Sequence, residues 1–122
     1  METIDLNHVA LHVSNLERSM EFYGEKLELE DLARPDFDFP GKWYRLGESQ
    51  ELHLIAGREG AVNSSSRGNH YALGVPDMDA AEAFLAQRGI EHTPRQTRPD
   101  GAFQIYIEDP DGYWIEFCQN PA

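Results

Sequence analysis

The chain has 122 residues, of which 40% are hydrophobic, and its 22 Asp and Glu against 10 Lys and Arg give a formal net charge of −12. This length and composition predict one globular domain, and the negative field argues against nucleic acid and anionic membranes as partners, because their phosphate groups are repelled. The sequence has no apolar run near the roughly 18 residues of a membrane span, no recognisable targeting segment at its start and a single cysteine, Cys118, so a cytoplasmic location is expected.

The first half of the chain predicts a strand, a helix and three further strands. Residues 7–13 are rich in Val, Leu and Ala, whereas residues 15–29 carry apolar side chains at spacings of three and four, which is typical of an amphipathic helix. Asn15 has the position of its N-cap. Three strand-like runs follow, separated by the turn residues of RPDFDFPG and GES: residues 27–32, 42–46 and 51–56.

The second half predicts the same order of elements. A short apolar strand at residues 71–75 precedes a second amphipathic helix, for which Asp77 is the expected N-cap and Gly89 the expected end. The turn sequences RPDG and DPDG then separate three strand-like runs: residues 90–96, 103–108 and 113–118.

A repeated motif links the two halves. The pattern Asn-His-x-Ala-Leu occurs at residues 7–11 and again at residues 69–73, and the predicted elements repeat with it, so each half reads βαβββ. One helix cannot cover the sheet of either half, and the halves are therefore expected to pack together as a single α+β domain. The predicted boundaries are residues 1–122 for the domain, about 1–57 for module one, 58–68 for a polar linker and about 69–122 for module two.

Alternation along the strands places histidines on polar faces. In the first strand, His8 and His12 share a face with Ala10, while the Val and Leu residues of the opposite face must meet the helix. The same reasoning puts a His or a Glu on the polar face of three other strands. Four potential ligands are thus expected to point the same way: His8, His53, His70 and Glu116.

These four side chains have the composition of a metal site. A single strand histidine is more often a hydrogen-bonded structural residue, but these three histidines and the glutamate would each need a separate partner to offset the cost of burial. One divalent cation satisfies all four, and three imidazoles with a carboxylate suit Zn, Ni, Co, Mn or Fe(II), whereas Ca and Mg prefer oxygen ligands. Cys118, on the same strand as Glu116, is interpreted as a small buried filler in preference to an additional soft ligand.

Three stretches carry a family resemblance: NHVALHVSNLERSMEFYGEKLEL, NHYALGV and above all DPDGYWIEF, in which a tight turn leads into a strand with a Glu. They resemble the vicinal oxygen chelate superfamily, which includes glyoxalase I, extradiol dioxygenases and bleomycin-binding proteins, and the resemblance covers nearly the whole chain. It implies paired βαβββ modules whose sheets curl round a central metal-binding cleft, commonly in a homodimer.

The resemblance also implies roles for individual residues. By position, His8, His70 and Glu116 correspond to the recurring set of two His and one carboxylate. His53 stands where glyoxalase I has a Glu that is a ligand and can also move a proton. This departure argues against the standard reaction on lactoylglutathione.

Alternation and the resemblance together indicate four substrate-binding residues. His12 stands where bacterial glyoxalase I has a basic residue for a glutathione carboxylate, Trp43 shares a strand face with Arg45, and the repeat aligns Trp43 with Tyr106. Such a set suits a flat or apolar small acid. The two aromatic residues are equally compatible with a core or interface role, and the arginine with an exposed one.

The expected function is that of a metal-dependent lyase or isomerase of glyoxalase type, acting on a small oxygen-chelating substrate with Glu116 as the base.

An iron-dependent dioxygenase using His8, His70 and Glu116 is an alternative, although His53 would close a position needed for oxygen and substrate together. A thiol transferase fits less well, because that family has Thr at the position of Ala10. A non-catalytic bleomycin resistance or binding module is a further alternative, and such proteins generally lack the ligands. The sequence does not identify the substrate or the native metal, nor does it show whether the ligands come from one chain or from two.

Overall fold

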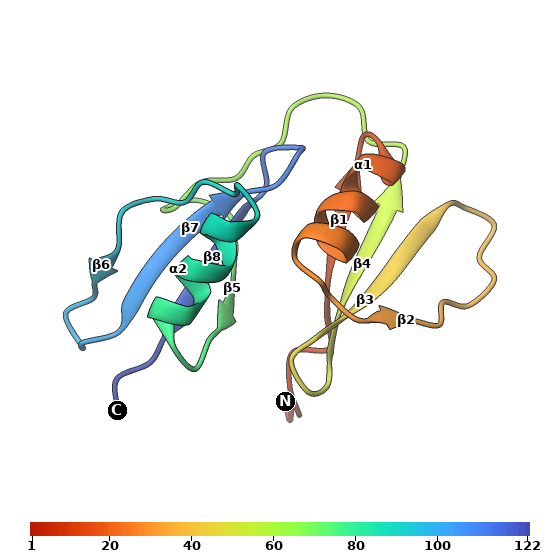
Figure 1. Cartoon of the computed structure of the whole chain (residues 1–122). Helices are drawn as coiled ribbons and strands as arrows, with labels where there is room; N and C mark the ends of the chain where they lie inside the picture. Colours follow the sequence, from red (N-terminus) through yellow and green to blue (C-terminus); the bar gives the residue numbers. More distant parts are fainter. The chain divides into compact units, whose positions relative to one another are not determined.

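The computed structural model describes residues 1–122 as two compact units, Met1–Gly60 and Ala61–Ala122. Each unit contains a four-stranded sheet with few helices (Figure 1). The chain is therefore α+β with two tandem βαβββ modules, which confirms the predicted fold class. None of its helices combines the length and the apolar character needed to cross a membrane.

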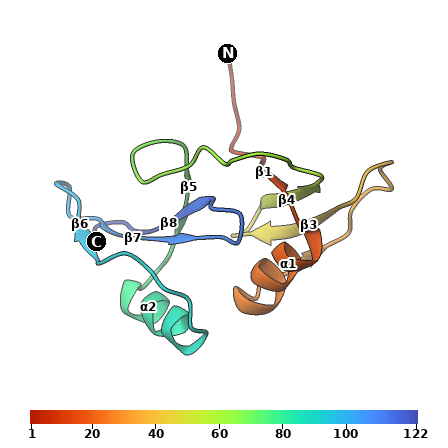
Figure 2. The ribbon, with the colours of Figure 1, turned by 90° about the horizontal axis from the view of Figure 1, so that it is seen from above.

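Unit one begins with a strand and a helix and continues with three strands. The elements are β1 (His8–Val13), α1 (Leu16–Met20), a π-helix η1 (Glu21–Lys26), β2 (Asp31–Leu32), β3 (Gly41–Leu46) and β4 (Gln50–Ala56). The sheet order is β1-β4-β3-β2, with β1 parallel to β4 and the other neighbours antiparallel. The helix covers one face of this sheet (Figure 2), so the opposite face is the one left for function.

The core of unit one follows the predicted alternation. Two alternate residues of each of the three long strands are buried on the helix side: Leu11, Val13, Tyr44, Leu46, Leu52 and Leu54. Phe22 and Tyr23 of η1 are buried as well. In β1 the intervening residues His8, Ala10 and His12 are exposed, as expected from the sequence.

The first helix differs from the continuous α-helix predicted over residues 15–29. It begins as expected, because the Asn15 side chain accepts a hydrogen bond from the Arg18 backbone N–H at 3.1 Å. After Met20, however, the winding changes to a π-helix that ends at Lys26. Within that segment Gly24 packs against a tyrosine, since a Cβ at this position would lie 2.8 Å from Tyr44 Oη.

Unit two repeats the pattern. Its elements are β5 (Tyr71–Gly74), α2 (Met78–Gln87), β6 (Gln96–Thr97), β7 (Phe103–Glu108) and β8 (Trp114–Gln119). The sheet order β5-β8-β7-β6 again has a parallel first pair and antiparallel neighbours. Its core contains apolar residues of the helix and of the two central strands: Met78, Leu85, Ile105, Ile107 and Ile115.

Two local signals predicted in unit two are confirmed. The Asp77 carboxylate accepts a hydrogen bond from the Asp79 backbone N–H at 2.9 Å and caps α2. Gly89, just after the helix, has a φ of 66°, a conformation that favours glycine. Side-chain and backbone chemistry at the two helix ends therefore sets the limits of α2.

The second and sixth predicted strands are shorter than expected. The run predicted over residues 27–32 forms only the two-residue strand β2, and the run over residues 90–96 is irregular except for its overlap with β6. Both are edge strands, so backbone pairing on one side decides their extent. The amino-acid pattern alone does not show how far that pairing reaches.

Candidate functional site

Three neighbouring strands of unit one bring predicted site residues onto the face opposite the helix. In the sheet register, His53 of β4 lies between Ala10 of β1 and Trp43 of β3. Two pairs away in the same register, His8 lies beside Glu51. The parallel pairing of β1 with β4 thus places two of the four predicted ligands on adjacent strands.

His53 is held on three sides. Its ring is stacked on Trp43 with centroids 3.9 Å apart and an interplanar angle of 1°, and on His8 with centroids 4.1 Å apart at 17°. Its Nε2 donates to Glu51 Oε1 at 2.9 Å. In a neutral imidazole this hydrogen bond leaves the lone pair on Nδ1. The aromatic contacts and the carboxylate therefore define both the orientation and the tautomer of His53.

The two histidines of β1, His8 and His12, have different surroundings. His8 Nδ1 donates to Asn7 Oδ1 at 2.8 Å, which leaves the lone pair of a neutral ring on Nε2. His12 Nε2 lies 3.1 Å from the carbonyl oxygen of Ala56 at the end of β4. His8 thus contacts His53, whereas His12 is engaged by the backbone at the far end of the strand.

Glu116 is the buried carboxylate of unit two, with only 5% of its surface exposed. It lies on β8 between Ala72 of β5 and Tyr106 of β7. Its Oε1 accepts a hydrogen bond from Tyr106 Oη at 3.1 Å, and its Oε2 accepts one from Gln104 Nε2 at 2.9 Å. These donors compensate for the water that the carboxylate loses on burial.

His70 faces oxygen acceptors with both of its ring nitrogens. Nδ1 lies 3.2 Å from the carbonyl oxygen of Ser65, and Nε2 lies 3.1 Å from Glu116 Oε1. A neutral imidazole carries only one N–H, so it can satisfy only one of these acceptors. At the other contact the lone pair of the neutral ring faces an oxygen atom.

Two neighbouring side chains have perturbed acidity. Burial, followed by the hydrogen bond to Glu116 and its charge, raises the pKa of Tyr106. Burial, followed by the charge of Glu116, also raises the pKa of the Cys118 thiol. Both groups therefore stay protonated at neutral pH, which keeps Tyr106 a hydrogen-bond donor and makes Cys118 a poor ligand.

Sequence reasoning missed three residues that contact the predicted ones: Asn7, Glu51 and Gln104. Glu51 precedes His53 by two residues and Gln104 precedes Tyr106 by two, so strand alternation places each on the same face as its neighbour. That signal was present in the sequence. The specific hydrogen bonds could not be read from it, because they depend on rotamers and on the neighbouring strands.

The predicted residues are not all assembled by the structure. Arg45 is beside Glu51 in the sheet register, but its Nη1 donates to the carbonyl oxygen of Glu48 at 3.1 Å. Neither unit by itself brings three or more His, Cys, Asp or Glu side chains into an arrangement that could hold a metal ion. Unit one contributes the His8–His53–Trp43 stack, and unit two the cluster of His70, Tyr106 and Glu116.

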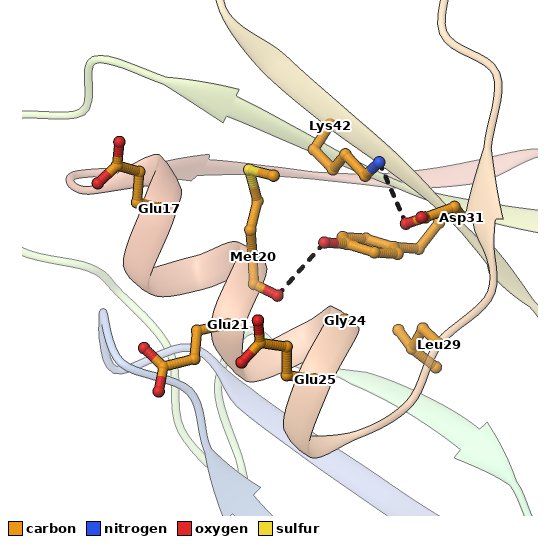
Figure 3. A pocket seen from close by; sticks show the side chains of 9 residues that line it. Glu17, Met20, Glu21, Gly24, Glu25, Leu29, Asp31 and Lys42 are labelled. Atoms are coloured by element: carbon orange, nitrogen blue, oxygen red, sulfur yellow. Dashed lines mark hydrogen bonds and ion pairs between the residues drawn. The ribbon is translucent and has the colours of Figure 1, made fainter.

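A pocket of about 500 Å³ lies on the helix side of unit one (Figure 3). Lys42 Nζ pairs with Asp31 Oδ1 at 3.1 Å at its edge, and Tyr44 Oη donates to the carbonyl oxygen of Met20 at 3.4 Å. The remaining lining residues are mostly acidic: Glu17, Glu21, Gly24, Glu25 and Leu29. Since no predicted ligand lines this pocket, it is separate from the candidate site.

Known proteins resemble this chain in sequence and in fold. Residues 5–117 match the family model of the Glyoxalase/Bleomycin resistance protein/Dioxygenase superfamily. A lactoylglutathione lyase of Haemophilus influenzae is 34% identical and the match covers 94% of this chain and 92% of that protein. Glyoxylase I 4 of Arabidopsis thaliana is 29% identical, with 93% of this chain and 69% of that protein covered. The crystal structure of a glyoxalase family protein from Enterococcus faecalis, 30% identical, superposes with a TM-score of 0.77 and covers 93% of this chain and 96% of that chain.

Proposed function

Because the chain belongs to the glyoxalase/bleomycin resistance protein/dioxygenase superfamily, we propose that it is a metal-dependent lyase or isomerase acting on a small molecule that chelates through two neighbouring oxygens. The observation that carries this proposal is the contact between His70 Nε2 and Glu116 Oε1 at 3.1 Å. With the His70 proton on Nδ1, two lone pairs face each other there. A divalent cation bound by both groups would remove that repulsion.

The donor types of both units suit such a cation. As the sequence predicts, we propose as ligands of a divalent transition metal, Zn, Ni, Co, Mn or Fe(II), Nε2 of His8 and Nδ1 of His53 in unit one, and Nε2 of His70 and the Glu116 carboxylate in unit two. In each imidazole the other nitrogen is already engaged, by Asn7, by Glu51 and by the Ser65 carbonyl respectively. Metal-binding histidines commonly have such a second partner, which fixes the tautomer and the ring orientation.

The chain's own residues would then move and hold the proton. A bound divalent metal supplies Lewis-acid polarisation of the two substrate oxygens, which acidifies the neighbouring C–H group. Glu116 is the only anionic base among the four proposed ligands, and we propose that it removes this proton and returns it. Tyr106 and Gln104 donate to the carboxylate and would keep it oriented during the transfer.

The identity of residue 53 separates the proposed reaction from that of glyoxalase I. The imidazole of His53, stacked between Trp43 and His8, stands where glyoxalase I has a carboxylate that can move a proton. A reaction needing two carboxylate bases is therefore disfavoured. We expect turnover of the methylglyoxal–glutathione hemithioacetal to be slow compared with that of the true substrate.

Metal analysis combined with a substrate panel tests the proposal. The full chain, purified without chelator, is expected to contain one equivalent of a transition metal and to turn over a member of a panel of thiol hemiacetals and acyl-CoA thioesters only when loaded. Glu116→Gln should keep part of the metal and lose at least about 100-fold in turnover, as expected for removal of a general base. His92→Ala is a matched control, because His92 contacts the Thr93 carbonyl and no proposed ligand.

Two outcomes would replace the proposal with another. Absence of stoichiometric metal from both purified and metal-reconstituted protein would favour a non-catalytic binding module. Bound iron with oxygen-dependent cleavage of catechols would favour a dioxygenase.

A further inference from the structure

Aromatic rings form a continuous series on the open face of unit one. We refer to Phe39, Phe37, Trp43, His53 and His8 as the aromatic row. Successive ring centroids lie 5.1, 6.1, 3.9 and 4.1 Å apart, so each ring contacts the next. The row starts at the loop between β2 and β3 and ends at two of the proposed ligands.

The outer end of the row is open to solvent. Phe37 and Phe39 keep 42% and 39% of their surfaces exposed, although the two rings are stacked on each other. The core of unit one does not need them, since its apolar contacts come from the opposite face of the sheet. Two large apolar rings held together in water mark a surface that is available for a ligand.

Arg34 contacts both Phe37 and Phe39. Its guanidinium carbon lies 5.0 Å from the centroid of each phenylalanine, and its Nη2 donates to the Phe39 carbonyl oxygen at 2.7 Å. A Cβ at Gly41 would meet the Leu54 carbonyl oxygen at 2.5 Å and Arg34 Nε and Nη2 at 3.0 Å. Gly41 and Trp43 share a strand face, so the absent side chain makes room for the guanidinium beside the row.

We propose that the aromatic row binds an aryl group of the substrate, so that the preferred substrate carries an aromatic ring next to its two chelating oxygens. This inference rests on the proposed function, because only that function makes the bound aromatic molecule a substrate. The exposed surfaces of Phe37 and Phe39 would supply ring contacts, and the imidazoles of His53 and His8 stand at the other end of the row, where the oxygens would be bound. Ring stacking on such faces favours flat aromatic groups over saturated rings of similar size.

The test compares two acids of matched shape on the full chain stripped of metal. Isothermal titration with benzoylformate and with cyclohexylglyoxylate is expected to show about fivefold tighter binding of the aromatic acid. The double variant Phe37→Leu, Phe39→Leu keeps apolar side chains and should reduce this preference to near unity. Phe84→Leu is the matched control, because Phe84 also lies under an arginine, Arg88, but in unit two, and it should leave the preference unchanged.

Three results would overturn the inference. The first is equal affinity of the wild-type chain for the two acids, and the second is an equal preference in the wild type and the double variant. The third is a lower mass of the double variant in light scattering with an unchanged ring preference, which would make the row a contact between copies of the chain. Metal content is measured on the purified protein before the metal is removed, so a ring preference in a protein that had bound no metal would support this inference while contradicting the proposed function.

Discussion

The two oxygens of Glu116 have unequal surroundings. Oε1 is shared by Tyr106 and His70, whereas Oε2 accepts only the Gln104 amide among the described contacts. Gln104 therefore orients the carboxylate and leaves Oε1 as the atom that can be presented to a cation. We expect loss of the Gln104 amide to affect metal affinity more than the free energy of unfolding.

The first prediction concerns this amide. Gln104→Leu removes the donor to Oε2, and we expect the affinity for Zn²⁺ or Co²⁺ to fall by about tenfold, the lower end of the effect of removing an outer-shell partner. Gln96→Leu, on the exposed neighbouring strand β6, is the control and should bind metal like the wild type. Unchanged metal affinity in Gln104→Leu, measured by competition with a chromogenic chelator, would contradict the positioning role.

At the scale of elements, the packing of η1 on β3 depends on one close contact. The Tyr44 ring is 2% exposed and its hydroxyl lies over Gly24, where no side chain intervenes. The π-helical winding and the glycine together let the helix approach the sheet. Local sequence preference therefore favours a helix here, whereas its π-helical winding accommodates Tyr44 of β3.

This contact gives a prediction with an unusual sign. Alanine in place of a helical glycine normally stabilises a protein by up to about 1 kcal/mol, but the Gly24→Ala methyl group would meet the buried Tyr44 hydroxyl at 2.8 Å. Overpacking of this kind costs about 1–3 kcal/mol, so we expect Gly24→Ala to lower the free energy of unfolding. Gly74→Ala, where a Cβ meets no atom within 4 Å, should be neutral in the same denaturant titration. A stabilised Gly24→Ala variant would show that the helix is not held against Tyr44.

Alkaline pH should weaken the same contact. Burial, followed by the negative charges of Asp31 and Glu25, raises the pKa of Tyr44 to about 12. The phenol is protonated in both the folded and unfolded states below pH of about 10, so its contribution is fully present there. Between about pH 10 and 12 the unfolded state loses the proton first, and stability should fall by about 2–3 kcal/mol.

Tyr44→Phe isolates this effect. The variant should lose the part of the alkaline destabilisation that belongs to Tyr44, while its stability at pH 7 changes by less than about 1 kcal/mol, because the hydrogen bond to the Met20 carbonyl is long at 3.4 Å. Urea titrations at a series of pH values provide the measurement. An identical pH profile for both proteins would exclude Tyr44 as the titrating group.

Elements whose limits depend on consecutive residues were predicted better than those whose limits depend on distant strands. Both N-caps and the glycine after α2 were predicted correctly, because each depends on a few consecutive residues. The strands β2 and β6 were predicted too long, since their extent depends on a partner strand elsewhere in the chain. The change to a π-helix after Met20 has no signal in the apolar spacing that predicted a helix there.

At the scale of the whole molecule, sheet edges and charge bear on assembly. Each sheet has a two-residue strand at one edge, whereas the opposite edges are β1, with six residues, and β5, with four. Long unpaired edges favour pairing or covering by another chain. The net charge of −12 opposes nonspecific association, so any stable assembly must be a specific one.

We therefore expect a homodimer. Light scattering after size exclusion should give twice the chain mass of 13.9 kDa at micromolar concentration, and the mass should persist at high salt, because screening weakens the repulsion between acidic chains. A monomer over the whole range up to about 100 μM, far above the dissociation constants of specific interfaces, would contradict this expectation.

The sequence by itself determined the periodic features of this protein: two βαβββ repeats, the buried face of each long strand and the positions of both helix caps. These follow from alternation and from the chemistry of consecutive residues, so they need no knowledge of distant contacts. Only the tertiary structure decided which atoms meet, namely His53 with Glu51, Trp43 and His8, and Glu116 with Gln104, Tyr106 and His70. The reason is that these partners lie on different strands or are selected by rotamers, and both the choice of neighbouring strand and the rotamer depend on packing between segments far apart in the sequence.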